Sequence, residues 1–134
     1  MSHPFSAFLT IFVGSGLGSI LRHAVNQACA AFFGINFPSG TLVVNIAGSL
    51  MMGLLAGWFT FRGDGQLLRL FLATGVLGGF TTFSAFSLDA ALLWERGQTG
   101  IAALYVGGSV AAGIISLFVG LAVMRALPRP RNLG

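Results

Sequence analysis

Four long apolar stretches with few charges set the tightest limit on how this chain can fold. A helix needs about 20 mostly apolar residues to cross the hydrocarbon core of a bilayer. Charged residues make up only 7% of the sequence, against about 25% in an ordinary soluble domain. We therefore predict an all-α membrane protein that forms a single integral membrane domain, residues 1–134. The predicted transmembrane helices cover residues 5–31, 40–61, 66–96 and 99–127, and a tail follows at 128–134.

The arginines lie near the ends of the apolar stretches and predict the orientation of the chain. Four crossings put both termini on the same side of the membrane, together with the connection between the second and third stretches. The arginines on that side are Arg62, Arg69, Arg125, Arg129 and Arg131, and those on the other side are Arg22 and Arg96. The positive-inside rule then favours cytoplasmic termini in a plasma (inner) membrane. The arginines do not gather into one basic face, so we expect no nucleic-acid partner.

Small residues spaced four apart predict where the helices pack closely. Such pairs allow two helix backbones to approach each other in lipid. The pairs are Gly14 with Gly18, Gly53 with Gly57, and Gly75 with Gly79. Three of the four stretches carry one, which favours a tightly packed bundle.

The segment GGFTTFSAF, residues 78–86, is a poor sequence for a plain membrane helix. Glycine weakens a helix by about 1 kcal/mol, and threonine hydroxyls compete for backbone hydrogen bonds. We therefore predict a break at 78–82, near the bilayer midplane. In hydrocarbon, unpaired backbone groups survive only where protein or water covers them, and such breaks commonly bind ions. A buried kink whose hydroxyls bond the preceding turn is the alternative.

Aromatic and polar residues near the predicted break are candidates for an ion site. Phe83 and Phe86 lie three residues apart on one helix face, and the positive edges of aromatic rings attract anions. Asn45 is an amide deep in the second stretch, and Tyr105 and Ser109 share a face of the fourth. Packing of the rings and structural hydrogen bonds between helices are the alternatives. Arg22 either draws anions into a vestibule or extends its charge to the interface.

At these residues the sequence resembles the Fluc (CrcB) family of fluoride channels. The resemblance covers nearly the whole chain, through GSGLGSILR (14–22), GTLVVNIAGS (40–49) and GVLGGFTTFSAFSLD (75–89). It implies a fluoride-selective passive anion channel that exports cytoplasmic fluoride and lowers fluoride toxicity. It also implies a dual-topology dimer in which a second copy, or a homologous sister subunit, inserts antiparallel.

The resemblance further implies roles for particular residues. Backbone carbonyls of Gly78 and Thr81 would bind one central structural Na⁺ shared by the two subunits. The rings of Phe83 and Phe86 and the amide of Asn45 would face fluoride in the pore. The implied polar track and vestibule residues are Thr41, Tyr105 and Ser109.

Three other classes of protein compete with this reading. A proton-coupled exporter of the small multidrug-resistance type needs a carboxylate within the membrane. The only acids are Asp64, Asp89 and Glu95, and none lies in the first stretch. The two histidines, His3 and His23, have no acid partner nearby in sequence, so we predict that the chain is not an enzyme. The third rival is a purely structural assembly subunit.

Overall fold

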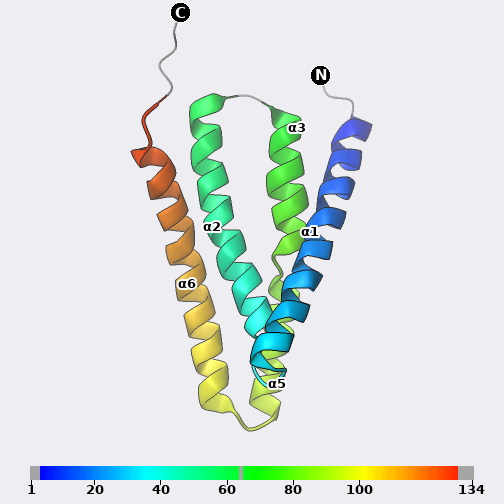
Figure 1. Ribbon diagram of the computed structural model, residues 1–134, viewed down its shortest axis with the longest axis vertical. Helices are drawn as coiled ribbons and strands as arrows, with labels where there is room; N and C mark the ends of the chain where they lie inside the picture. Colours follow the sequence, from blue (N-terminus) through cyan, green and yellow to red (C-terminus); the bar gives the residue numbers. More distant parts are fainter. Residues whose placement is uncertain (1–3, 64, 130–134) are drawn as a thin grey trace, which may run out of the picture.

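The computed structural model describes residues 4–63 and 65–129 and is helical throughout apart from short connections (Figure 1). Four helices in it are long and apolar enough to cross a membrane, which confirms the predicted all-α membrane fold. The third crossing is divided into four segments. In chain order the elements are α1 (Pro4–Phe33), α2 (Ser39–Arg62), α3 (Gln66–Arg69), η1 (Leu70–Leu77), α4 (Gly78–Phe80), α5 (Phe83–Glu95) and α6 (Thr99–Ala126). Of the residues discussed above, His3, Asp64, Arg131 and tail residues 130–134 lie outside the described residues.

The helices run up and down, so the start of α1 and the end of α6 lie at the same end of the bundle (Figure 1). At the opposite end, Gly34 and Gly97 reverse the chain after α1 and α5 with φ values of +78°. Glycine takes up this left-handed conformation without steric cost. The molecule therefore has one end with the termini and one end with the 34–38 and 96–98 connections, which we call the connection end.

Glycines bring the helices together in two closely packed pairs. Along α1, a Cβ added at Gly14 or Gly18 would meet the backbone of η1, at Phe71 and Val76 respectively. Along α2, a Cβ at Gly53 would meet the carbonyl oxygen of Leu117 in α6. The predicted glycine pairs therefore lie at close contacts between helices, against backbone atoms except at Gly57, which meets the side chain of Met124. A larger residue at these positions would force the helices apart.

The third crossing leaves helical geometry at Thr81 and Thr82. Their φ and ψ angles are −84° and 157°, and −153° and 120°, which are extended conformations. Gly78 and Gly79 remain helical within α4, so the departure covers two residues rather than the whole of 78–82. A Cβ at Gly79 would collide with the backbone of Ser15, and this close packing against α1 leaves little room for another path.

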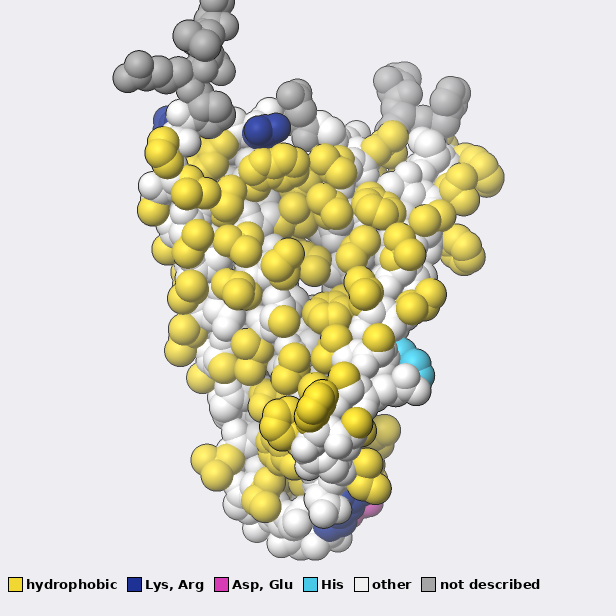
Figure 2. All heavy atoms as spheres, viewed as in Figure 1, with side chains coloured by type: hydrophobic (Ala, Val, Ile, Leu, Met, Phe, Trp, Pro, Cys, Tyr) yellow, Lys and Arg dark blue, Asp and Glu magenta, His cyan; other side chains and the backbone are white. Residues whose placement is uncertain are grey.

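The surface of the bundle is apolar over most of its length. Hydrophobic side chains cover the face shown in Figure 2, and arginines lie near its two ends. Phenylalanines such as Phe8 and Phe12 on α1 are 73% and 77% exposed. Such a surface fits the lipid interior of a bilayer, where exposed apolar side chains carry no penalty.

Candidate functional site

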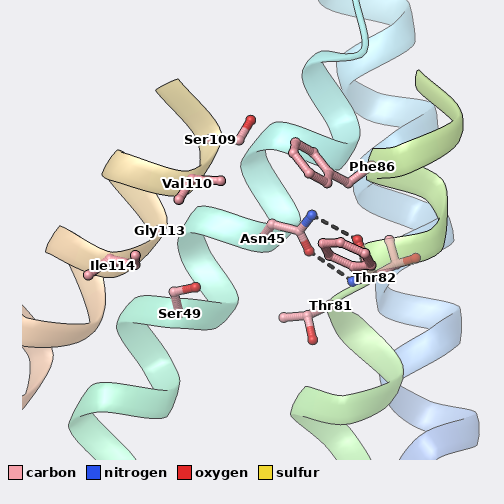
Figure 3. Close-up of a pocket in the computed structure, with 10 residues that line it drawn as sticks. Asn45, Ser49, Thr81, Thr82, Phe86, Ser109, Val110, Gly113 and Ile114 are labelled. Carbon is pink, nitrogen blue, oxygen red and sulfur yellow. Dashed lines mark hydrogen bonds between the residues drawn. The ribbon is translucent and has the colours of Figure 1, made fainter. Parts of the chain in front are cut away.

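A groove beside the interruption in the third crossing gathers most of the predicted site residues. It has a volume of about 350 Å³ and lies between α2, α5 and α6 (Figure 3). Its lining consists of Asn45, Ser49, Thr81, Thr82, Phe83, Phe86, Ser109, Val110, Gly113 and Ile114. Five of these were predicted from the sequence, namely Asn45, Thr81, Phe83, Phe86 and Ser109.

The side chain of Asn45 spans the gap in the third crossing. Its Nδ2 donates a hydrogen bond to the carbonyl oxygen of Thr82 over 2.9 Å, and its Oδ1 accepts one from the Thr82 N–H over 2.8 Å (Figure 3). Thr82 is 9% exposed, so its backbone groups have little access to solvent. Because the carboxamide has two N–H donors, one of them remains for another partner. Asn45 therefore makes the structural hydrogen bond expected of a buried amide and keeps one free donor.

Thr82 also starts the next helix. Its Oγ1 accepts a hydrogen bond from the N–H of Ala85 over 3.2 Å, which caps the first turn of α5. Such a cap replaces one of the intrahelical partners that the first N–H groups of a helix lack. The cap fixes where α5 begins, and so sets the direction in which Phe83 and Phe86 point.

The hydrogen bonds at the interruption divert donors away from two carbonyl groups. In a continuous helix the N–H of Thr82 would bond the oxygen of Gly78, and that of Ala85 would bond the oxygen of Thr81. Here the first N–H bonds Asn45 and the second bonds the Thr82 hydroxyl. These are the two carbonyls that the family resemblance assigns to Na⁺. Hard cations bind such oxygen ligands, so the residues present fit the ion.

The two predicted pore phenylalanines lie together at the groove but differ in exposure. Their ring centroids are 5.7 Å apart, with an angle of 47° between the ring planes. Phe83 is 79% exposed, whereas Phe86 is half-buried, 5.3 Å from the ring of Tyr105. The edges of the Phe83 ring are therefore accessible from outside this chain, and the groove is open on that side.

Tyr105 and Thr41 lie between the groove and the connection end. Tyr105 is 2% exposed, and its hydroxyl donates a hydrogen bond to Asp89 Oδ2 over 3.0 Å. The Phe37 ring meets it edge-on at 5.7 Å. Thr41 is buried and lines a separate cavity of about 200 Å³, which Asp89 also lines. Tyr105 and Thr41 therefore lie next to the groove but do not line it.

Arg22 is not part of either cavity. It lies on α1, partly exposed, about 16 Å along the helix from its end at Phe33. Its helix packs against η1, α4 and α2, whereas Ser109 lies on α6.

The family comparison decides between the classes of membrane protein considered above. The model of the family described as "CrcB-like protein, Camphor Resistance (CrcB)" matches residues 9–121. The chain belongs to the CrcB family. The match extends over all four crossings and includes every residue of the groove, and it confirms the resemblance predicted from the motifs.

Curated relatives match over nearly their whole length. "Fluoride-specific ion channel FluC 2" of Nitrobacter hamburgensis is 59% identical over 121 residues, which are 90% of this chain and 98% of the relative. "Fluoride-specific ion channel FluC" of Methylobacterium nodulans is 64% identical over 118 residues, 87% of this chain and 94% of the relative. A protein of the same name from Rhodopseudomonas palustris is 57% identical over 121 residues, 90% and 98% of the two chains. With its four apolar helices, this CrcB-family chain is a multi-pass membrane protein.

Three polar groups of this CrcB-family chain were not singled out from the sequence. Thr82 was expected only as part of the break, yet its backbone and hydroxyl organise the site. Ser49 lines the groove four residues after Asn45, and this helical spacing would have placed both on one face. Asn26 Oδ1, like the hydroxyl of the predicted Ser109, is buried without a hydrogen-bond partner among the described residues. No motif or spacing in the sequence distinguishes Asn26, which is a single amide in α1.

Proposed function

We propose that this protein is a fluoride-selective passive anion channel that exports cytoplasmic fluoride and lowers fluoride toxicity. The observation that carries the proposal is the groove, which combines the Phe83 and Phe86 rings with the Asn45 amide and the Ser109 hydroxyl. The relatives that share more than half of its residues are named as fluoride-specific ion channels. As predicted, the chain is a channel protein and not an enzyme.

The chemistry of the groove suits a small, strongly hydrated anion. A pore must replace the water that fluoride loses, and it must bind the ion weakly enough to release it. The free N–H of Asn45, the hydroxyl of Ser109 and the positive edges of the two rings are neutral groups that supply such contacts. No described charged side chain lines the groove, so no fixed cation would trap the ion.

A second copy of the chain, inserted antiparallel, would complete the pathway. The groove is open, and Phe83 is 79% exposed, so one chain leaves the pathway unenclosed on this side. In a dual-topology dimer the interruptions of the two subunits would meet near the bilayer midplane. A homologous sister subunit is the alternative partner, because the excess of arginines at the end with the termini is larger than equal insertion in both directions would give.

A structural Na⁺ at the dimer centre would be held by the carbonyl oxygens of Gly78 and Thr81 from each subunit. The support is that the helical donors to these two oxygens are diverted to Asn45 and to the Thr82 hydroxyl. When bound, the ion would supply a positive charge that balances the carbonyl dipoles and joins the two interruptions.

Export follows from the chemistry of hydrofluoric acid in a plasma (inner) membrane. In acidic surroundings neutral HF crosses the bilayer, dissociates in the less acidic cytoplasm and leaves fluoride inside. A passive channel then lets the ion leave down its own gradient, without a coupled proton or a second substrate.

Ion efflux from liposomes tests the proposal. Purified protein is reconstituted into vesicles loaded with either fluoride or chloride, and release is followed with ion-selective electrodes. We expect rapid fluoride release and little chloride release. Rapid chloride release, or no fluoride release from protein that elutes as a single folded species, would contradict the proposed function.

A further inference from the structure

The hydroxyl of Ser49 is placed in the groove without an internal hydrogen bond. No hydrogen bond within residues 4–63 and 65–129 involves it, although Ser49 is partly buried. Later on the same helix, Thr60 satisfies its own hydroxyl by donating to the carbonyl of Ala56 over 2.9 Å. A hydroxyl in an apolar environment gains free energy from any acceptor within reach. The hydroxyl of Ser49 can therefore donate a hydrogen bond to an ion or molecule in the groove.

Gly113 on α6 leaves the space beside this hydroxyl open. A Cβ built at Gly113 would lie 3.5 Å from Ser49 Oγ, at ordinary van der Waals contact. Both residues line the groove, and Figure 3 shows Ser49 on the side of α2 that faces α6. A larger side chain at residue 113 would occupy part of this space, so the absence of a side chain keeps the Ser49 hydroxyl uncovered.

Ser49 adds a hydrogen-bond donor to the groove on the side nearer the end with the termini. α2 and α6 both start at the connection end, so Asn45 and Ser49 advance in the same direction as Ser109 and Gly113. Residues four apart on a helix are separated by about 6 Å along its axis. Ser49 therefore lies about one helical turn beyond Asn45, and the neighbouring Gly48 approaches the side chain of Thr81 at the interruption.

We propose that the Ser49 hydroxyl is a further ion-contacting group, which receives the anion on the terminus side of Asn45. The inference rests on the proposed function and adds a residue to its pathway. In this arrangement the free N–H of Asn45 and the hydroxyls of Ser49 and Ser109 form a short series of neutral donors. An ion passing from one to the next exchanges a single hydrogen bond at a time, which keeps each contact escapable.

A pair of isosteric variants tests the contribution of the hydroxyl. Ser49→Thr keeps the hydroxyl, and Ser49→Val replaces it by a methyl group of similar size. We expect fluoride efflux through Ser49→Val to be about tenfold slower than through Ser49→Thr, the effect of removing one hydrogen bond to a charged partner. Thr60→Val is the matched control on the same helix. It removes a hydroxyl outside the groove and should leave efflux unchanged.

A second-site variant separates a donor role from packing. In Ser49→Ala/Gly113→Ser the hydroxyl returns to the same space from α6, and we expect efflux to recover to within about threefold of the wild type, from about tenfold slower in Ser49→Ala alone. Equal rates for Ser49→Thr and Ser49→Val, or no recovery in the double variant when it elutes as folded protein, would overturn the inference. In both cases rapid fluoride release by the wild type would leave the proposed function standing, whereas a wild type that releases none would remove both.

Discussion

Replacing Asn45 by leucine tests how the interruption in the third crossing is held together. The carboxamide bonds both the N–H and the C=O of Thr82, at 2.8 and 2.9 Å. Leucine has a similar size but can make neither bond. Its introduction would leave a buried donor and a buried acceptor unpaired, since Thr82 is only 9% exposed.

The expected loss of stability follows from these two bonds. An unsatisfied buried polar group costs about 1–3 kcal/mol, so the pair would cost about 2–6 kcal/mol. Interhelical hydrogen bonds in membrane proteins average about 0.6 kcal/mol each, which sets a lower limit of about 1 kcal/mol for the pair. Because the Thr82 backbone is shielded from water, we expect Asn45→Leu to lower the free energy of unfolding by at least 2 kcal/mol, the bottom of the about 2–6 kcal/mol range.

Equilibrium unfolding in mixed micelles measures this loss. Increasing the mole fraction of a denaturing detergent unfolds the protein, and the fluorescence of Trp58 and Trp94 reports the transition. Thr60→Val is the control, since its hydroxyl bonds only its own helix at an exposed position and should cost about 0.5 kcal/mol or less. Hydrogen exchange of the Thr82 amide should accelerate in Asn45→Leu and remain slow in the control.

An unfolding free energy for Asn45→Leu within about 0.5 kcal/mol of the control would refute the reasoning. If fluoride efflux were lost at the same time, Asn45 would act on the ion alone, and its bonds to Thr82 would contribute nothing to the fold.

Three further substitutions examine other parts of the structure. Phe83→Ile should abolish most fluoride efflux from protein that still folds, because this ring is largely exposed in the single chain. Size-exclusion chromatography checks the folded state, and the efflux assay checks the flux. Gly18→Ala would bring a Cβ against the carbonyl oxygen of Val76, so it should destabilise the protein by about 1–3 kcal/mol in detergent unfolding. Gly16→Ala is the control, because the space around Gly16 is open, and it should not destabilise the protein. Asp89→Asn keeps an acceptor for the Tyr105 hydroxyl and should only modulate fluoride efflux, whereas a proton-coupled exporter of the small multidrug-resistance type would lose drug transport completely.

The four crossings could be predicted because hydropathy and length are local properties of the sequence. The extent of the interruption could not, although its threonines were identified. Gly78 and Gly79 have the weakest helix propensity in the segment, yet both remain helical. Gly79 is held by close packing on Ser15, and the N–H and hydroxyl of Thr81 both bond the carbonyl of Leu77 to close the last turn. Tertiary packing therefore overrides propensity at the glycines, and only a structure reveals that contact.

The residue types of the site were predictable, but their pairings were not. An amide deep in a membrane helix must find a partner, and this much marked Asn45. That the partner is the backbone of Thr82 depends on the relative heights of α2 and α5, which no local pattern encodes. Tyr105 was expected in a polar track with Ser109, and only the structure reveals that its hydroxyl donates a hydrogen bond to Asp89. The roles of Gly78, Thr81 and Arg22 in ion binding stay predictions.

The hydrogen bonds between Asn45 and Thr82 also bear on the order in which the chain is made. Asn45 precedes Thr82 by 37 positions, so the ribosome delivers the amide well before the residue it pairs with. At about 5–20 residues per second, that lead amounts to a few seconds. The second crossing can therefore enter the bilayer before the third crossing is complete. When the third crossing follows, the amide donor and acceptor of Asn45 are already in the membrane. The N–H and C=O of Thr82 can then pair with them at once, so the nascent chain does not pass through a state with unpaired backbone groups in the hydrocarbon.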